Sequence, residues 1–354
     1  MKILFVISSL SAGGAERVLS LLANELSEDH EVSIATLSDE PSFYPIDPRV
    51  TLRPLGLLRP SRSVGERLRQ SLRRIGVLRD LIRSEDPDIV VSFMTQTNLL
   101  SIVAARLSGK PVIVSERIAY DFQRALPVRT LRRMIYPLAD MLVVQSRGDA
   151  GHYGWMHSVE VIPNPVAYTP ERIDFSAKEP LILGVGRLDP QKGFDRLIEA
   201  FARLDHRRWR LVIAGEGPER ANLERLIAAQ RLDNVTLIGR QKEIESWYRR
   251  ASIFVLSSRR EGFPNVLLEA MAHGCACVAF DCPYGPGEII EADRDGILVP
   301  DQDLTALTES LGRLMEDASL RARLGKRAEA VRERYGIQTV VSRWEAIMKK
   351  VVHG

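Results

Sequence analysis

Two carboxylates, Glu261 and Glu269, are separated by seven residues in the segment EGFPNVLLEAMAHG, which covers residues 261–274. The apolar run 253–258 before it predicts a buried parallel strand, and the helix formers after it predict a helix that ends at Gly274. The turn between strand and helix consists of Gly262, Phe263, Pro264, Asn265 and Val266. Because a helix N-terminus exposes backbone N–H groups, this turn favours an anion such as a diphosphate. One carboxylate could then bind a sugar and the other a ribose.

A second segment, GVGRLDPQKGFDRLIEAF at residues 184–201, supplies two cations. The strand predicted there ends at Gly186, and Arg187 and Lys192 follow in a loop that precedes a helix. Two cations in such a loop can neutralise a diphosphate without a metal ion. A surface loop with two solvated cations is the plain alternative.

Three further segments that follow predicted strands contain candidate residues. Gly13 and Gly14 follow the first strand and open a helix, which permits close approach of the backbone to a phosphate. Glu216, in the segment 214–220, and Arg240, in the segment 239–248, could edge a pocket for a base. A tight turn for the glycines and solvated side chains for the two charged residues remain open alternatives. The three D-x-D triplets are interpreted as solvated turns, so no metal is predicted.

These residues must be held by alternating strands and helices, which predict parallel doubly wound sheets. Predicted strands cover residues 2–7, 31–37, 50–55, 89–93, 112–116, 141–145 and 159–163 in the first half, and 181–186, 210–215, 234–239, 252–257, 277–280 and 296–300 in the second. A Pro/Asn-rich break at residues 162–180 separates the halves and predicts a hinge between two domains. The chain's 354 residues are enough for two cores.

The spacing of Glu261 and Glu269, with EGFP before and EAMAHG after, resembles the Glu-x7-Glu motif of family 4 glycosyltransferases. The segments that contain Arg187, Lys192, Gly14, Glu216 and Arg240 are similar to further stretches of that family. The resemblance implies a GT-B fold of two Rossmann-like domains that face a central cleft. Residues 1–165 would bind the acceptor, and residues 166–336 would bind the nucleotide-sugar donor. A C-terminal helix at 337–354 would cross back to the first domain.

The resemblance implies transfer of a hexose or N-acetylhexosamine from a nucleotide sugar, expected to be a UDP-sugar. The transfer would retain configuration and would need no metal or other cofactor. Arg187, Lys192 and the helix N-terminus would stabilise the leaving diphosphate. Glu269 would hold the ribose, and Glu261 the sugar near the reacting carbon. The absence of an obvious nucleophile implies front-face attack, in which the leaving phosphate takes the acceptor proton.

One departure from the family concerns the end of a strand in the first domain. Many members have a His-Asp pair there, whereas this chain has Ser115, Glu116 and Arg117. Arg117 could face the donor phosphate as a catalytic cation, and Glu116 could contact the acceptor. The variant is similar to a subgroup that extends oligosaccharides on polyprenyl-diphosphate carriers, which implies a lipid-linked acceptor for polysaccharide or glycan assembly.

A basic stretch suggests where such an acceptor is met. Residues 49–83 hold ten arginines against Glu66 and Asp80, although the whole chain carries a net charge of only +3. On a helical wheel, an apolar stripe consists of Val64, Leu68, Leu72, Ile75, Leu78 and Ile82. Arg69 and Arg73 point away from this stripe, Arg74 lies on its flank, and Arg132 and Arg133 could extend the basic surface. This pattern favours peripheral contact with an anionic membrane, or simply a solvated helix.

The remaining composition narrows the class of protein. No apolar run is long enough to span a bilayer. The segment MKILFVISSL is interpreted as a first strand and not as an export signal. These features predict a cytoplasmic protein at the inner face of the membrane. Cys275, Cys277 and Cys282 fit buried reduced thiols. No nucleic-acid partner is predicted. The rival functions are a nucleotide-sugar epimerase of the same architecture, an NAD-dependent oxidoreductase, for which the glycine fingerprint is missing, and a non-catalytic sugar-nucleotide sensor.

Overall fold

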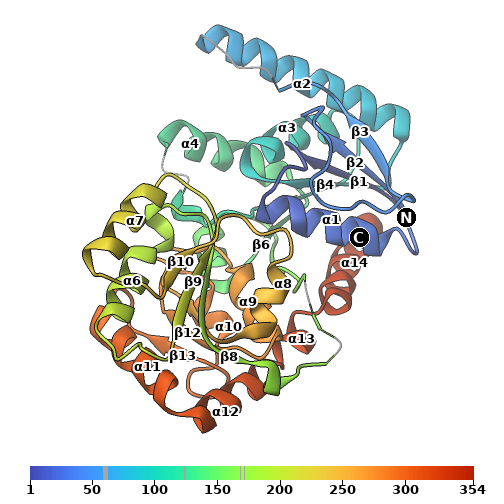
Figure 1. The fold of residues 1–354 in the computed structure, drawn as a ribbon. Coiled ribbons are helices and arrows are strands. Elements are labelled where there is room, and N and C mark those ends of the chain that lie inside the picture. Colours follow the sequence, from blue (N-terminus) through green and yellow to red (C-terminus); the bar gives the residue numbers. More distant parts are fainter. Residues whose placement is uncertain (59–62, 123–124, 168, 171) are drawn as a thin grey trace. The chain divides into compact units, whose positions relative to one another are not determined.

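The computed structural model describes the whole chain except residues 59–62, 123–124, 168 and 171, and it divides into two compact units (Figure 1). The first unit consists of Met1–Pro165 and Ile337–Gly354, and the second of Val166–Gly336. Each unit contains one sheet whose strands all pair in parallel, as the alternation of strands and helices predicts.

The first unit is built on a seven-stranded sheet in the order β3-β2-β1-β4-β5-β6-β7. Its strands are β1 (Lys2–Ile7), β2 (Glu31–Thr36), β3 (Thr51–Pro54), β4 (Ile89–Phe93), β5 (Val112–Ser115), β6 (Met141–Val144) and β7 (Val159–Val161). Its helices are α1 (Gly14–Leu26), α2 (Val64–Glu85), α3 (Thr95–Arg106), α4 (Leu126–Ile135), α5 (Arg147–Ala150) and α14 (Ile337–His353). Because side chains alternate along a strand, β1 sends Phe5 to one core and Leu4 to the other.

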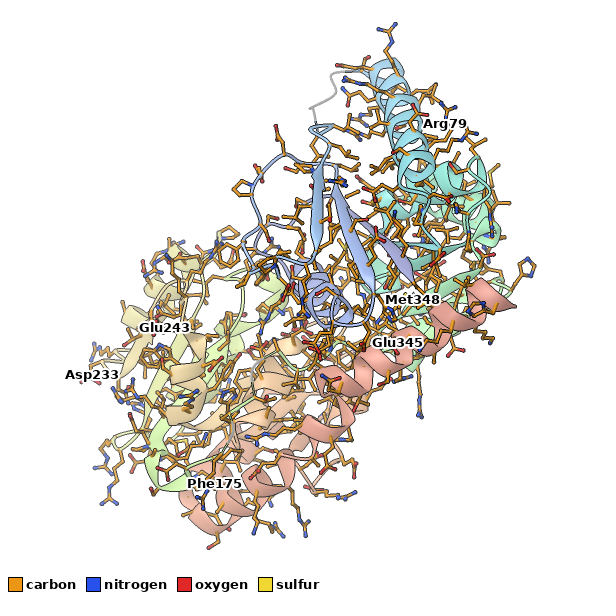
Figure 2. All side chains as sticks on the ribbon, turned by 90° about the vertical axis from the view of Figure 1, so that its right-hand side faces the viewer. Arg79, Phe175, Asp233, Glu243, Glu345 and Met348 are labelled. Carbon is orange, nitrogen blue, oxygen red and sulfur yellow. The ribbon has the colours of Figure 1, made fainter. Side chains whose placement is uncertain are left out.

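The C-terminal helix α14 belongs to the first unit, as the resemblance implied. Trp344 and Met348 are fully buried in the same core as α1, and the ring of Trp344 stacks on Phe93 of β4 with centroids 5.8 Å apart. On its outer side, the Glu345 carboxylate lies 2.9 Å from Nε2 of His30. Figure 2 shows Glu345 and Met348 along this helix.

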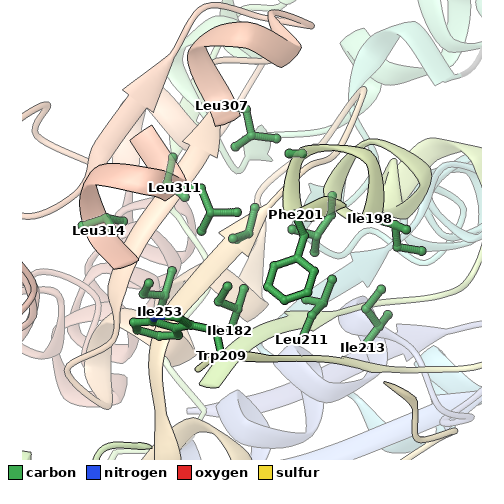
Figure 3. Packing of buried hydrophobic residues seen from close by; sticks show 14 of the residues in the cluster. Ile182, Ile198, Phe201, Trp209, Leu211, Ile213, Ile253, Leu307, Leu311 and Leu314 are labelled. Carbon is green, nitrogen blue, oxygen red and sulfur yellow. The ribbon is translucent and has the colours of Figure 1, made fainter. Parts of the chain in front are cut away.

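The second unit is built on a six-stranded sheet in the order β10-β9-β8-β11-β12-β13. Its strands are β8 (Glu179–Val185), β9 (Arg210–Ala214), β10 (Val235–Leu237), β11 (Ala251–Leu256), β12 (Ala276–Phe280) and β13 (Ile297–Val299). Its helices are α6 (Phe194–Ala202), α7 (Arg220–Ala229), α8 (Ile244–Arg250), α9 (Asn265–Ala272), α10 (Pro286–Ile289), α11 (Leu304–Glu316), α12 (Ala318–Ala328) and α13 (Val331–Arg334). Figure 3 shows one of its two cores, where Ile182, Ile253 and Leu211 of the sheet pack with Phe201 of α6 and Leu311 of α11.

The order of the strands marks one place in each sheet where a ligand is expected. The chain builds outward from β1 in the first sheet and from β8 in the second, and it then crosses over to β4 and β11 on the other side. Ligands of open parallel sheets bind outside the carboxyl ends of the strands at such a switch point. The loops after β8 and β11, which contain the predicted residues Arg187, Lys192 and Glu261, meet at the switch point of the second sheet.

Candidate functional site

Lys192 and Glu261 form an ion pair at the switch point of the second sheet. Lys192 Nζ lies 2.6 Å from Glu261 Oε1, and the hydroxyl of Ser258 donates to the same oxygen at 2.6 Å. The side chains are 19% and 6% exposed, respectively, so the pair is largely shielded from water. The sequence assigned these residues to different parts of a ligand, and it missed Ser258, which the run of serines at the end of β11 could have indicated.

The loop after β8 and the loop after β11 come into contact at Gly193. Gly193 follows the turn Pro190–Lys192 and has a φ of +64°, and a Cβ placed on it would lie 2.1 Å from the carbonyl oxygen of Ser257. The Ser257 hydroxyl in turn donates to the Lys192 carbonyl at 3.0 Å. Only glycine allows this close approach without strain, so Gly193 determines how near Lys192 comes to Glu261.

The helix α9 begins directly after the predicted anion-binding turn. Pro264 is its N-cap residue, one position earlier than expected, and the Pro264 side chain makes no capping hydrogen bond. Phe263 is 7% exposed, and its ring lies 5.8 Å from that of Tyr335. The turn is supported by Gly285, whose φ is +90° and whose added Cβ would lie 2.6 Å from Pro264 Cδ. The N-terminus of α9 is therefore held in place and offers its backbone N–H groups to an anion.

Glu269 lies inside α9 and is 1% exposed. The hydroxyl of Tyr248, at the end of α8, donates to its Oε2 at 3.0 Å. The sequence did not single out Tyr248, because nothing local links it to a glutamate that is 21 residues away. This hydrogen bond fixes one carboxylate oxygen of the residue that was predicted to hold a ribose.

Arg187 is the exposed cation of the site. Its side chain is 73% exposed, and its Nε lies 2.7 Å from Asp189 Oδ2. Asp189 is only 9% exposed at its side chain and also accepts a hydrogen bond from the Lys192 backbone N–H at 3.2 Å. Asp189 therefore contacts the side chain of Arg187 and the backbone of Lys192, the two predicted phosphate-binding cations.

Glu216 and Arg240 stand at the ends of neighbouring strands, β9 and β10. Glu216 Oε1 accepts from Arg220 at 2.7 Å, and Arg240 is exposed. The backbone N–H of Gly215 donates to the Gly239 carbonyl at 2.9 Å, so the two strand ends are joined. The structure brings both residues to the carboxyl edge of the second sheet, where the sequence placed them.

In the first unit, the predicted glycine loop opens α1. Gly14 is the first residue of this helix and Gly13 its N-cap. The carboxylate of Glu16 folds back so closely that a Cβ on Gly13 would lie 2.1 Å from Glu16 Oε2. Burial raises the pKa of Glu16, which the backbone N–H of the same residue only partly offsets. The sequence did not single out Glu16.

Glu116, directly after β5, and Arg132 of α4 both lie in the interior of the first unit. Glu116 is 1% exposed and accepts hydrogen bonds from Thr95 at 2.8 Å and from Tyr136, and Arg132 Nε lies 3.6 Å from it. The Arg132 guanidinium lies over the rings of Tyr120, Tyr136 and Tyr153. Burial raises the pKa of Glu116 even though Arg132 opposes the shift. The prediction that Arg132 extends a basic surface is wrong, because this carboxylate and these rings hold it inside.

Arg117 points to a different side of the first sheet from its neighbour Glu116. It is 7% exposed, its guanidinium lies 5.0 Å from the Phe93 ring centroid and 5.5 Å from that of Trp344, and Nη1 donates to Asn164 at 2.8 Å. Burial lowers its pKa to about 9. Among the described residues, its Nε and Nη2 have no hydrogen-bond partner. The structure therefore places Arg117, the predicted catalytic cation, against the rings of Phe93 in β4 and Trp344 in α14.

The basic helix α2 is only half covered by the body of the first unit. Leu78 and Ile82 are fully buried, whereas Val64, Leu68 and Leu72 of the same stripe are 81%, 63% and 62% exposed. Figure 1 shows the first turns of α2 extending outward from the first unit. Arg67, Arg69 and Arg73 are exposed there, and Arg74 is tied by its Nε to the Leu57 carbonyl. Of the ten arginines in the stretch, Arg59 and Arg62 lie outside the described residues.

Several other predictions concern groups away from these residues. Cys275, Cys277 and Cys282 are free and buried, as predicted. Within the part of the chain that the structure describes, no cluster of histidine, cysteine or acidic residues could hold a metal ion. In that same part, no helix has the length and hydrophobicity needed to cross a bilayer. Arg133 is exposed on α4, with its guanidinium 5.9 Å from the Trp155 ring centroid.

Comparison with known proteins covers both halves of the chain. Residues 12–168 match the family described as Glycosyltransferase Family 4, and residues 169–331 match the family described as Glycosyl transferases group 1. A Campylobacter jejuni protein named GalNAc-alpha-(1->4)-GalNAc-alpha-(1->3)-diNAcBac-PP-undecaprenol alpha-1,4-N-acetyl-D-galactosaminyltransferase is 30% identical over 99% of this chain and 99% of its own length. The amylovoran biosynthesis glycosyltransferase AmsD of Erwinia amylovora is also 30% identical, over 98% of this chain and 99% of its own.

Solved structures share the fold. The sucrose-phosphate synthase of Thermosynechococcus elongatus superposes with a TM-score of 0.82 at 19% identity and covers 98% of both chains. Anabaena Alr3699/HepE, in complex with UDP, superposes with a TM-score of 0.79 at 17% identity over 99% of this chain and 100% of that chain. These matches identify the GT-B architecture, and the sequence relatives do not support the epimerase or the oxidoreductase alternative.

Proposed function

The chain belongs to the group 1 glycosyltransferases that carry a family 4 N-terminal half, and from this premise we propose that it transfers a hexose or N-acetylhexosamine, with retained configuration, from a UDP-sugar to a polyprenyl-diphosphate-linked glycan. The observation that carries the proposal is the Lys192–Glu261 pair at the switch point of the second sheet, with Arg187 in the same loop as Lys192 and the N-terminus of α9 directly after Glu261. The second unit then binds the donor, and the first binds the acceptor.

The donor diphosphate binds beside the positively charged groups of the second unit. Arg187 is exposed, so its side chain has room to turn from Asp189 to a phosphate, and Lys192 can keep Glu261 while one of its other N–H groups donates to the diphosphate. The N–H groups at the start of α9 add a further electropositive contact. These groups supply the charge stabilisation that a metal ion provides in other transferases, which supports a metal-independent reaction.

The reaction that this arrangement supports breaks the bond between the anomeric carbon and the β-phosphate oxygen. Negative charge then develops on the diphosphate, where Arg187, Lys192 and the α9 N-terminus stabilise it more strongly than in the ground state. An acceptor hydroxyl oxygen forms the new bond on the same face, and its proton passes to the departing phosphate oxygen. Glu261 binds sugar hydroxyls, and Glu269, already oriented by Tyr248, binds the ribose.

The acceptor proposal rests on the relatives and on the surface of the first unit. The Campylobacter jejuni relative is named for an undecaprenol-diphosphate-linked substrate. On α2, the exposed Leu68 and Leu72 are each followed in sequence by an exposed arginine, Arg69 and Arg73, and on α4 Leu126 and Met134 are 73% and 69% exposed. Apolar side chains that enter the headgroup boundary, together with basic residues on anionic headgroups, are the two contributions that bind a helix to a membrane surface. We expect peripheral contact with an anionic membrane through α2 and α4.

A transfer assay with a defined lipid-linked acceptor tests the enzymatic proposal. The full chain is incubated with a panel of UDP-sugars and a polyprenyl-diphosphate-linked oligosaccharide, with and without a chelator, and the anomeric coupling of the product is read by NMR. We expect an α-linked product from an α-donor and an undiminished rate with the chelator. A β-linked product, or a rate that needs a divalent ion, would contradict the retaining, metal-independent mechanism.

Vesicle cosedimentation tests the membrane contact separately. Each basic residue near an anionic surface contributes on the order of 1 kcal/mol, so changing Arg69, Arg73 and Arg74 together to glutamine should weaken binding to anionic vesicles by well over tenfold. Leu68→Ser with Leu72→Ser should weaken binding without changing its dependence on salt. Arg208→Gln with Arg225→Gln, in the second unit, is the control. Binding that ignores lipid charge and all of these substitutions would leave a soluble acceptor as the better proposal.

A further inference from the structure

Two side chains that the proposed reaction does not use lie beside the glycine loop of the first unit. This loop, residues 8–13, joins β1 to α1 at the carboxyl edge of the sheet, at the switch point between β1 and β4. Glu16 lies in the first turn of α1, and Phe43 lies in the segment that follows β2. Because ligands of open parallel sheets bind at such an edge, both side chains stand where a ligand of the first unit is expected.

Phe43 is an exposed aromatic ring on a backbone that is held in place. The side chain is 53% exposed, and the backbone N–H donates to the carbonyl of Leu10 in the glycine loop at 2.8 Å. The ring lies edge to face with that of Tyr44, with centroids 5.1 Å apart, and the Tyr44 hydroxyl donates to the Gly13 carbonyl at 3.1 Å. Phe43 therefore offers a flat apolar surface that is fixed to the glycine loop at two points.

Glu16 brings a carboxylate to the same loop. Its side chain is half-buried and folds back against Gly13, the N-cap residue of α1. Burial raises the pKa of Glu16, and its own backbone N–H partly offsets that shift. Among the described residues, no cation pairs with it. A carboxylate has lone pairs for several donors, so Glu16 can accept further hydrogen bonds from a ligand.

The negative charge of Glu16 selects between two kinds of ligand for this loop. Gly13 and Gly14 at the start of a helix favour an anion when their sequence is considered alone. In the structure, however, the Glu16 carboxylate lies against Gly13 at that helix start, and like charges repel at such short range. A neutral ligand with hydroxyl donors and an apolar face fits both Glu16 and Phe43, whereas a phosphate fits neither.

We propose that Phe43 and Glu16 form a subsite for a sugar ring of the acceptor glycan. The C–H groups on one face of a pyranose pack on the electron-rich face of the Phe43 ring, and hydroxyls at the edge of the pyranose donate to the Glu16 carboxylate. This inference rests on the proposed function, because it takes the first unit as the acceptor-binding unit. It adds the residues that recognise a sugar of the acceptor, as distinct from its diphosphate or its lipid.

Fluorescence of a Phe43→Trp variant tests the subsite without a transfer step. Tryptophan keeps the aromatic surface, and its emission changes when a sugar stacks on it. The full chain is titrated with methyl α-glycosides of hexoses and N-acetylhexosamines, and the emission of the four native tryptophans is subtracted with the wild type. We expect a saturable change with at least one glycoside and none with inorganic phosphate. Adding Glu16→Gln should raise the midpoint about fivefold or more, because a charge-assisted hydrogen bond becomes a neutral one.

Two further variants check the role of the Glu16 carboxylate. Gly13 has an extended backbone, with a φ of −149°, which alanine also adopts. Gly13→Ala therefore displaces the Glu16 carboxylate without straining the backbone, and it should weaken glycoside binding as Glu16→Gln does. Glu28→Gln, which alters an exposed carboxylate 3.5 Å from Arg49 in the same unit, is the matched control and should leave the midpoint unchanged. Since glutamine also serves in a capping box, Glu16→Gln should keep α1 folded.

Transfer kinetics separate this inference from the proposed function. With a lipid-linked acceptor, Phe43→Ala and Glu16→Gln should each raise the acceptor KM about threefold to tenfold and leave the affinity for UDP unchanged. Leu107→Ala, which shortens another exposed apolar side chain of the first unit, should change neither.

The outcomes distinguish the two proposals. Active transfer with an unchanged acceptor KM in both variants would refute the subsite and leave the transferase proposal standing. No transfer with any donor and acceptor, together with a glycoside response of Phe43→Trp that Glu16→Gln weakens, would refute the transferase and support the subsite. An emission that no glycoside changes, that phosphate changes equally, or that responds identically with Glu16→Gln would overturn the subsite.

Discussion

Glu261→Gln probes the ion pair at the switch point of the second sheet, since glutamine keeps the shape of the side chain and removes its charge. Lys192 then loses a carboxylate 2.6 Å away in a site where the two side chains are only 19% and 6% exposed. Removing one partner of a fully buried pair costs about 3–5 kcal/mol. Because Lys192 retains some access to water and glutamine still accepts a hydrogen bond, we expect a loss of about 1–2 kcal/mol. For a unit of this size, the Tm should fall by roughly 2–8 °C.

The kinetic effect should be larger than the loss of stability alone can explain. If Glu261 binds the sugar in the transition state, the lost charge-assisted hydrogen bond is worth about 1.5–3 kcal/mol. The kcat/KM for donor should therefore fall roughly tenfold to a hundredfold, with most of the loss in kcat. Lys192→Met should lower kcat/KM by a similar factor because it removes a cation from the leaving diphosphate.

The double variant Lys192→Met/Glu261→Gln separates stability from catalysis. No uncompensated charge remains in it, so its Tm should recover towards that of the wild type while its activity stays low. Thermal melts followed by circular dichroism and initial rates with radiolabelled donor provide the two measurements. Asp205→Asn, which breaks the exposed pair with Arg207, is the control and should change neither. Additive losses of Tm in the double variant, or near-normal kcat/KM in Glu261→Gln, would refute the reasoning.

Three other predictions have distinct expected outcomes. Glu269→Ala should raise the KM for donor and weaken UDP binding in calorimetry by roughly tenfold or more, and unchanged UDP affinity would exclude the ribose contact. Gly193→Ala should destabilise the second unit and abolish transfer because its φ is +64° and its Cβ would meet the Ser257 carbonyl, whereas Gly76→Ala in α2, with open space around it, should stabilise by about 0.5–1 kcal/mol in urea melts. Burial lowers the pKa of His273 from 6.5 to about 4. Between these two pH values, His273 is protonated in the unfolded chain but neutral in the folded one. The free energy of unfolding should therefore fall as the pH drops from 6.5 to 4, by up to about 3 kcal/mol. His273→Asn should lack this part of the pH dependence in urea unfolding, and an unchanged profile would contradict the buried neutral ring.

Local pattern was enough to predict both sheets and the loops that contain the candidate site residues. Alternation of apolar strands with helices determines parallel sheets because each strand must be covered on both faces. The segment 261–274 predicted strand, turn and helix from propensity and from Pro264 and Gly274 alone, and the structure shows the helix at Asn265–Ala272. Arg187 and Lys192 were placed in the right loop because the end of β8 can be read from its apolar run.

Only the tertiary structure decided which charges meet and which apolar residues are covered. Lys192 and Glu261 are 69 residues apart, and they pair because β8 and β11 are neighbours in the sheet. Arg132 is buried because a carboxylate 16 residues away in the chain faces it across the interior. A helical wheel predicts the apolar stripe of α2, but it cannot show how far along the helix the rest of the first unit covers that stripe. In the structure, Leu78 is covered and Leu72 is exposed. Local sequence sets the conformation and faces of each element, whereas ion pairing and burial depend on neighbours that are distant in the chain.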